Sequence, residues 1–220
     1  MGARFVTCDV FTNRLFGGNP LAVFPDARAI PEGALQSIAR EFNLSETVFI
    51  YPPENPQHTR RLRIFTPAAE LPFAGHPTIG AAHVLTALGH VRVTGPETRI
   101  VFEEGVGPVP VLVRADKGIP TFAQLTAAQA PEIGPPTPGR SVLADVLSLE
   151  ATDILGGMVA PQGVSCGLPF LIVPLRDRDA VRRAKVRVDH WESSLKSYWA
   201  PQILVYSRDP EIEGSDLRVR

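Results

Sequence analysis

Two short stretches of the sequence carry residues that could move a proton on a small anionic molecule. In the first, Gly75-His76-Pro77-Thr78 stands where a helix over 76–90 is expected to begin. Proline is well tolerated at the first helical position, which puts His76 near the N-cap. The N–H groups of the next three residues are then free to bind a carboxylate or a phosphate, helped by the helix dipole.

The residue types at this helix start suit ligand binding. Gly75 has no side chain, so a ligand can approach the backbone closely. His76 adds a proton donor or acceptor of the kind that titrates near neutral pH. The alternative interpretation is a capped helix with a surface histidine, because helix starts are common and anion sites are few.

The second stretch, Ser45-Glu46-Thr47, opens a predicted strand directly after a predicted helix. A carboxylate at a strand edge, beside apolar Leu44 and Val48, can serve as a general acid or base. The alternative here is a solvated glutamate in a helix-to-strand turn, since most glutamates are exposed.

Two further patterns give weaker indications of chemistry. Residues 163–167 fit the G-x-S-x-G pattern of serine hydrolases, but a predicted strand follows Ser165 where that pattern requires a helix. His76, His83 and His90 recur every seven residues, about 10 Å along a helix, which is too far to share one metal ion. We therefore predict no metal, and serine hydrolysis at Ser165 is kept as a minor alternative.

Hydrophobic periodicity predicts the elements that must position these residues. Two amphipathic helices are expected, 31–43 and 76–90, and the second should end at Gly89. The buried stripe of the second helix is predicted to be Ile79, Ala82, Leu85 and Leu88. The predicted strands are 4–12, 21–25, 46–52, 61–67, 98–105 and 107–115.

A segment rich in proline and glycine, 130–140, predicts a linker, so that the lobes are 1–129 and 130–220. The expected second-lobe elements are a helix over 140–149, a strand near "ILGGMVA", the strands "PFLIVPL" and "QILVYS", and helical stretches around 177–184 and 189–198. This order is not a clean βαβ alternation, which disfavours a Rossmann fold. A pair of α+β lobes, each a curved sheet wrapped on a helix, fits the pattern better.

Composition excludes several classes of protein. The chain has 220 residues, of which 44% are hydrophobic and 20% charged, as in ordinary globular proteins. Its net charge of -1 argues against a nucleic-acid partner. No apolar run reaches the roughly 20 residues that cross a bilayer, so no membrane partner is expected. Cys8 and Cys166 form no disulfide framework, which favours a reduced, cytoplasmic enzyme.

Three long stretches resemble the phenazine-biosynthesis PhzF-like protein family: "CDVFTNRLFGGNPLAVFPDA", "IAREFNLSETVFI" and "RIFTPAAELPFAGHPTIGAAHVL". The resemblance is closest over about the first 90 residues and continues more weakly through "GVSCGLPFLIVPL". It implies an α+β fold similar to that of the cofactor-independent diaminopimelate epimerases. That fold has two pseudo-symmetric lobes, each a barrel-like mixed sheet around a central helix, with the active site between them.

The resemblance also implies isomerase chemistry by proton transfer on a small carboxylate-bearing substrate, with no metal or organic cofactor. Glu46 matches the glutamate that moves the proton, and His76 is the second expected catalytic residue. The expected substrate-binding residues are Ser45, Gly75, Pro77 and Thr78. Members of the family often dimerise, so a homodimer is expected.

The family's second lobe carries a motif of its own, Glu-Asp-Pro-Ala-Thr-Gly-Ser-Ala, whose aspartate faces the glutamate. In this sequence the run "RRLRIFTP" begins again near the end as "DLRVR", and no Asp-Pro-Ala-Thr-Gly-Ser stretch occurs. We therefore expect an incomplete second lobe and weak or absent catalysis by this chain alone. The alternative function is that of a catalytically inactive binding or scaffold protein.

Overall fold

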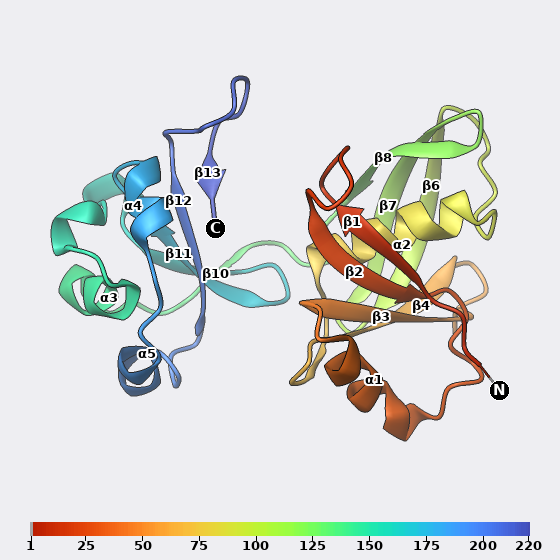
Figure 1. Ribbon diagram of the computed structural model, residues 1–220, viewed down its shortest axis with the longest axis horizontal. Helices are drawn as coiled ribbons and strands as arrows, with labels where there is room; N and C mark the ends of the chain where they lie inside the picture. The colour runs from red at the N-terminus through yellow and green to blue at the C-terminus, as the bar shows by residue number, and fades with distance from the viewer. Residues whose placement is uncertain (1) are drawn as a thin grey trace. The chain divides into compact units, whose positions relative to one another are not determined.

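The structure is a computed structural model that describes residues 2–220. The chain divides into two compact units, the first ending at Gln129 and the second beginning at Ala130 (Figure 1). Each unit has its own sheet and its own hydrophobic core. Within residues 2–220, no helix is both long enough and apolar enough to cross a membrane.

The first unit is built on one mixed β-sheet. Its strands are β1 (Val6–Val10), β2 (Asn19–Phe24), β3 (Glu46–Tyr51), β4 (Arg60–Phe65), β5 (Glu70–Leu71), β6 (Glu97–Glu104), β7 (Gly107–Asp116) and β8 (Ile119–Leu125). They lie in the order β1-β2-β3-β4-β6-β7-β8, and β5 pairs with β4. The pairs β2–β3 and β4–β6 are parallel. Strands β5 and β8 were missed by the sequence analysis, whereas the other strands overlap their predicted ranges.

Buried and less buried residues alternate along β6 and β7, so each of these strands has one buried face, whereas β2 and β3 are buried on both faces over most of their length. In β7, Val109, Val111 and Val113 are buried. Pro108, before the first valine, and Pro110, between the first two, are exposed. Successive side chains of a strand point to opposite faces, so the three valines share the inner face of the sheet. There they join the core of the first unit.

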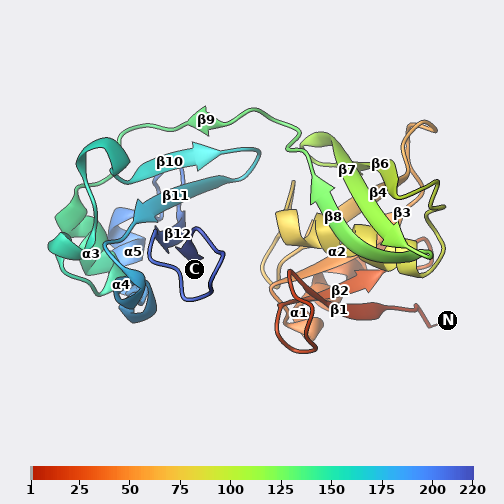
Figure 2. The ribbon, with the colours of Figure 1, turned by 90° about the horizontal axis from the view of Figure 1, so that it is seen from above.

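Helix α2 (Gly75–Ala87) lies inside the curl of this sheet (Figure 2). Both edge strands, β1 and β8, contact α2, so the sheet curves around the helix. As a result α2 is buried on nearly all sides, not along one stripe as predicted. Leu88, assigned to that stripe, follows the helix and is 47% exposed. The predicted stop is confirmed, since Gly89 adopts a φ of 74° just after the helix.

Small residues allow α2 to lie this close to the sheet. A methyl group on Gly80 would come within 2.5 Å of Leu21 Cδ2 and 2.9 Å of Val10 Cγ2. Those side chains are themselves buried and have little room to move. Glycine at this position therefore sets the distance between α2 and the β1–β2 pair.

A second, smaller core covers the outer face of the same sheet. Helix α1 (Leu35–Phe42), preceded by a short 3-10 turn (Glu32–Ala34), packs there on Phe24, Phe49 and Phe65. The prediction of a helix in this segment is confirmed. The φ of 51° at Asn43 ends the helix and turns the chain into β3.

The second unit has a smaller sheet with helices on one face. Its strands are β9 (Glu132–Ile133), β10 (Gln162–Ser165), β11 (Pro169–Pro174), β12 (Gln202–Ser207) and β13 (Arg218–Val219), in the order β13-β12-β11-β10-β9. Its helices are α3 (Arg140–Leu147), α4 (Arg178–Arg183) and α5 (Val188–Ser194), with 3-10 turns at Ala151–Asp153 and Gly157–Val159. Leu171 and Val173 of β11 and Val205 of β12 form one core with apolar residues of α3 and α4.

Two predictions for the second unit differ from the structure. The stretch "ILGGMVA" contains a 3-10 turn and one isolated bridge between Ile154 and Leu175, not a strand. Its two consecutive glycines disfavour a strand. The segment 130–140, predicted to be a linker, includes β9, which pairs with β10.

A buried carboxylate joins several segments of the second unit. The side chain of Asp153 is 3% exposed and lies 3.0 Å from both Arg176 Nη2 and Arg183 Nη2. It also accepts the Glu150 backbone N–H at 3.1 Å. Burial alone would raise the pKa of Asp153, but the Arg183 and Glu150 hydrogen bonds and the two arginine charges outweigh burial and lower it.

Asp153→Asn is expected to destabilise the second unit by about 2 kcal/mol at pH 7, because a charge-assisted hydrogen-bond network is lost. The folded state binds the Asp153 proton less tightly than the unfolded chain, so this contribution is present above the unfolded pKa and disappears as the pH falls through the lowered folded value. Urea unfolding of the full chain at pH 7 and pH 3 measures the loss of stability and its dependence on pH. A difference that is equally large at pH 3 would contradict the assignment, and Asp189→Asn, at an exposed carboxylate, is the control.

Candidate active site

Strand β3 and helix α2 bring the two predicted catalytic side chains together. Glu46 is the first residue of β3 and pairs in parallel register with Leu21 of β2. His76 is the second residue of α2, which packs against β2 and β3. The left-handed Asn43 and the start of β3 therefore place the carboxylate beside the beginning of the buried helix.

The contact between these side chains is close and shielded from solvent. Glu46 Oε2 lies 3.2 Å from His76 Nε2, and the side chains are 17% and 10% exposed. Neither atom has a well-oriented hydrogen-bond partner among residues 2–220. Buried polar atoms are nearly always paired in folded proteins. The two atoms therefore retain hydrogen-bonding capacity that a bound molecule can use.

The charge state of the pair follows from its burial. Burial lowers the pKa of His76, and the nearby Glu46 carboxylate opposes this by raising it. The net direction is downward, so the imidazole is neutral at pH 7. A neutral imidazole has one nitrogen that donates and one that accepts a hydrogen bond.

The N-cap of the helix is Ala74, not a residue near His76 as predicted, and this changes which backbone groups are free. Ala74, with a φ of -153°, is the N-cap, and its carbonyl accepts the Thr78 N–H at 3.3 Å. The N–H of Thr78, predicted to be free, is thus used within the helix. The groups left at the helix start are the N–H of Gly75 and of His76, because Pro77 has none. Proline fits this position because no N–H is needed in the first turn.

The structure separates the predicted substrate-binding residues into two sets. Ser45 is exposed, next to Glu46, and its hydroxyl donates to Asn19 Oδ1 at 3.0 Å. Gly75 is half-buried at the helix start, with no atom close to where a Cβ would stand. Pro77 and Thr78 are buried. The Thr78 side chain points away from solvent, so Thr78 cannot present its hydroxyl to a ligand in this conformation.

Glu104, the last residue of β6, was missed by the sequence analysis. It is 9% exposed, and its Oε1 lies 2.7 Å from Thr78 Oγ1. Burial raises its pKa to about 7, against the lowering effect of hydrogen bonds from Thr78 and the Ala74 backbone. Strict alternation along β6, which buries Ile100 and Phe102, was the signal that could have placed Glu104 on the inner face.

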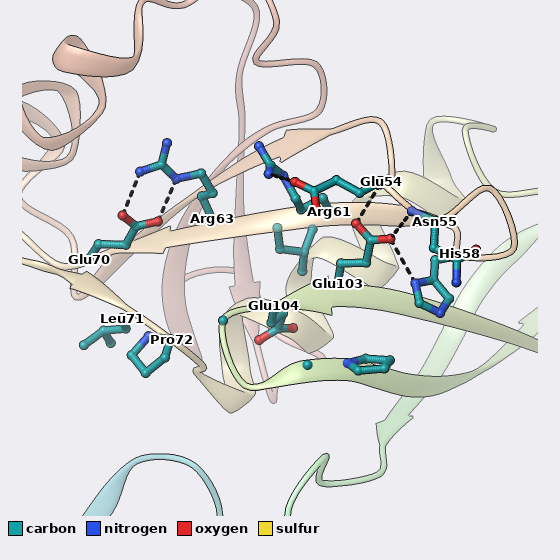
Figure 3. A pocket seen from close by; sticks show the side chains of 14 residues that line it. Glu54, Asn55, His58, Arg61, Arg63, Glu70, Leu71, Pro72, Glu103 and Glu104 are labelled. Carbon is teal, nitrogen blue, oxygen red and sulfur yellow. Dashed lines mark hydrogen bonds and ion pairs between the residues drawn. The ribbon is translucent and has the colours of Figure 1, made fainter.

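A hollow of about 720 Å³ opens beside Glu104 (Figure 3). Its charged side chains are largely paired with one another. The Glu103 carboxylate contacts the Glu54 and Asn55 backbone N–H groups at 2.8 and 2.7 Å and His58 Nδ1 at 2.9 Å (Figure 3). Among the described residues that line this hollow, neither Glu46 nor His76 occurs.

Two other side chains with nucleophilic groups, Ser165 and Cys8, lack the surroundings that nucleophilic chemistry needs. Ser165 ends strand β10, and its hydroxyl accepts the Gly167 N–H at 3.1 Å. Strand β11 follows, so the strand–turn–helix of a nucleophile elbow is not formed. Burial, followed by the Asp9 charge, raises the pKa of Cys8 to about 11, which keeps this thiol protonated at neutral pH.

The profile of the phenazine biosynthesis-like protein family, PhzC-PhzF, matches residues 8–212. The chain belongs to the PhzC-PhzF family. An uncharacterized isomerase from Mesorhizobium japonicum is 37% identical over 220 residues, covering 99% of this chain and 72% of that protein. A trans-2,3-dihydro-3-hydroxyanthranilate isomerase from Pseudomonas aeruginosa is 40% identical over 118 residues, covering 52% of this chain and 39% of that enzyme.

Solved structures of a PhzF-family protein and of an epimerase have the same fold as this PhzC-PhzF protein. A PhzF-family protein from Bacillus anthracis has a TM-score of 0.81 at 25% identity, covering 98% of this chain and 70% of that one. A hydroxyproline epimerase from Agrobacterium vitis has a TM-score of 0.60 at 12% identity, covering 98% and 68%. The latter likeness concerns the fold alone. The α+β, epimerase-like architecture and the family predicted from sequence are confirmed, and the Mesorhizobium and Pseudomonas relatives are named as isomerases.

Proposed function

We propose that this PhzC-PhzF protein is an isomerase that moves a proton on a small, carboxylate-bearing molecule, with Glu46 as the general acid and base. The observation that carries the proposal is the shielded pair of Glu46 Oε2 and His76 Nε2, 3.2 Å apart and each without a well-oriented hydrogen-bond partner in the described chain. A buried carboxylate beside a neutral imidazole is suited to accepting a proton from carbon and returning it elsewhere.

The start of α2 supplies the complementary binding site. The N–H groups of Gly75 and His76 and the positive end of the helix dipole favour a carboxylate held at this point. A substrate carboxylate bound there would lie next to the Glu46 side chain. Glu46 would take a proton from one carbon of the substrate and give it to another, so the proton balance closes with no outside reagent. The reaction is proposed to need no metal and no organic cofactor.

The neutral state of His76 suits a role in binding the substrate while Glu46 moves the proton. A neutral imidazole has one N–H with which it can donate a hydrogen bond to the substrate. Ser45, next to Glu46 at the exposed edge of the strand, is the proposed hydroxyl contact at the rim of the site.

Solvent isotope exchange tests the proposed function. The chain is incubated in D₂O with trans-2,3-dihydro-3-hydroxyanthranilate, the compound in the name of the Pseudomonas relative, and products are followed by NMR and mass spectrometry. Deuterium on a ring carbon together with an isomerised product is the expected result. Binding of this probe with neither deuterium uptake nor an isomerised product would contradict proton transfer and would favour the catalytically inactive binding protein.

A further inference from the structure

Three oxygen atoms form a short chain at the first turn of α2. Thr78 Oγ1 lies 2.8 Å from the Ala74 carbonyl oxygen and 2.7 Å from Glu104 Oε1. Both separations are those of O–H···O hydrogen bonds. Thr78 is 0% exposed, so water does not take part from its side.

Two hydrogen bonds in this chain need two protons. The Ala74 carbonyl is an acceptor only, and the Thr78 hydroxyl has one hydrogen to donate. With Glu104 ionised, that single hydrogen would have to serve both neighbours, and one short oxygen–oxygen contact would have none. With Glu104 protonated, the carboxyl donates to Thr78 and Thr78 donates to Ala74, so both contacts are hydrogen bonds.

The surroundings of Glu104 also favour the neutral acid. Its second oxygen, Oε2, is buried and has no hydrogen-bond partner among the described residues. An ionised carboxylate with an unpaired buried oxygen is costly. In agreement with this, burial raises the pKa of Glu104 to about 7, although Thr78 and the Ala74 amide lower it.

The turn after β6 holds the segment that leads into α2 at a second point. The Val106 N–H donates to the Pro72 carbonyl at 3.2 Å. A methyl group on Gly105 would stand 2.8 Å from Pro72 Cα, so the two backbones are in direct contact. Residues 104–106 therefore hold the chain on the N-terminal side of His76, while the oxygen chain holds it at Thr78.

We propose that Glu104 is a positioning residue for His76. As the neutral carboxylic acid it completes the hydrogen-bond chain through Thr78 to Ala74, and this chain keeps the first turn of α2 where His76 meets Glu46. Ionisation of Glu104 removes one proton from the chain and loosens that turn. The catalytic relevance of the proposal rests on the proposed function, but the coupling between Glu104 and His76 does not.

The charged groups near Glu104 form ion pairs with other residues and not with Glu104. Around the same hollow, Arg61 is paired with Glu54, Arg63 with Glu70, and Glu103 with His58. On α2, His76 faces Glu46, and the pKa of His83 is lowered by burial. The causes of the Glu104 shift are burial and the Thr78 and Ala74 hydrogen bonds.

NMR titration of the full chain tests the proposal without any substrate. Glutamate is labelled at the carboxyl carbon and histidine in the ring, and Glu104→Gln and His76→Gln assign the two resonances. We expect one carboxyl signal to titrate near pH 7 and to be absent in Glu104→Gln. We expect the His76 ring signal to show an inflection at the same pH, separate from its own titration at lower pH, and to lose it in Glu104→Gln.

Further variants keep the test decisive if Glu104→Gln folds poorly. Thr78→Val removes the linking hydroxyl and should abolish the His76 inflection, while Thr78→Ser should restore it. Glu97→Gln, on the same strand but exposed, should leave it unchanged. A Glu104 midpoint below pH 5, or a His76 inflection that persists in Thr78→Val, overturns the proposal. Isotope exchange on the wild-type chain is a separate measurement, so its failure is distinguishable from failure of the coupling.

Discussion

Glu46→Gln is expected to reduce solvent deuterium exchange into the substrate by about a thousandfold, within the range attributed to a positioned general acid or base. Glutamine has nearly the same shape as glutamate and can keep the contact with His76, but it does not take up a proton from carbon. The loss should therefore appear in kcat, with KM for the probe changed much less. Initial rates of exchange measured by NMR at pH 7 check both parameters.

The matched control is Glu41→Gln, a glutamate near the end of α1 that is exposed to solvent. It changes the net charge by the same amount and should leave exchange within about twofold of the wild type, since a solvated carboxylate outside the site contributes little. Full-rate exchange by Glu46→Gln would show that another group moves the proton.

Phe49→Ala is expected to lower the free energy of unfolding of the first unit by about 3–5 kcal/mol. The Phe49 ring is fully buried, stacks on Phe24 with centroids 4.9 Å apart, and meets Phe65 edge-on at 5.5 Å. Removing it leaves a cavity between two aromatic rings and loses both ring–ring contacts. Because Phe49 and Glu46 lie on the same strand, the chain should also lose activity at temperatures where that strand unfolds.

Phe16→Ala provides the control for this loss, because the Phe16 side chain is 94% exposed. Its replacement should change the unfolding free energy by no more than about 0.5 kcal/mol. Urea unfolding followed by far-UV circular dichroism compares the two variants. Equal losses for Phe49 and Phe16 would mean that the outer aromatic core contributes far less than its burial indicates.

Local patterns in the sequence were sufficient for most of the elements around the candidate site. Alternation along 4–12 located β1, and helical spacing located α1. The length of the matching motifs around Glu46 and His76 indicated the family, and the match of the PhzC-PhzF family profile to residues 8–212 confirms it. These features depend on near neighbours along the chain, so a single sequence reports them directly.

Errors arose where the environment of an element comes from distant parts of the chain. A single buried stripe was predicted for α2, but strands from both edges of the sheet contact it and bury it almost entirely. The start of α2 at Gly75 depends on the Ala74 carbonyl, which accepts the Thr78 N–H. The prediction assumed that the first helical residue is Pro77, and the sequence alone does not show the bond from Thr78 to Ala74.

By itself, then, the sequence determined the residue types at the site, the strands and helices that carry them, and the family. Only the tertiary structure decided that Glu46 Oε2 and His76 Nε2 approach to 3.2 Å and that Glu104 contacts Thr78 in the first turn of α2. The reason is physical: these contacts join residues 26 to 30 positions apart, brought together by a sheet that curls around one helix. Burial lowers the pKa of His76 on that helix and raises the pKa of Glu104 at the end of β6, and burial is set by the tertiary structure.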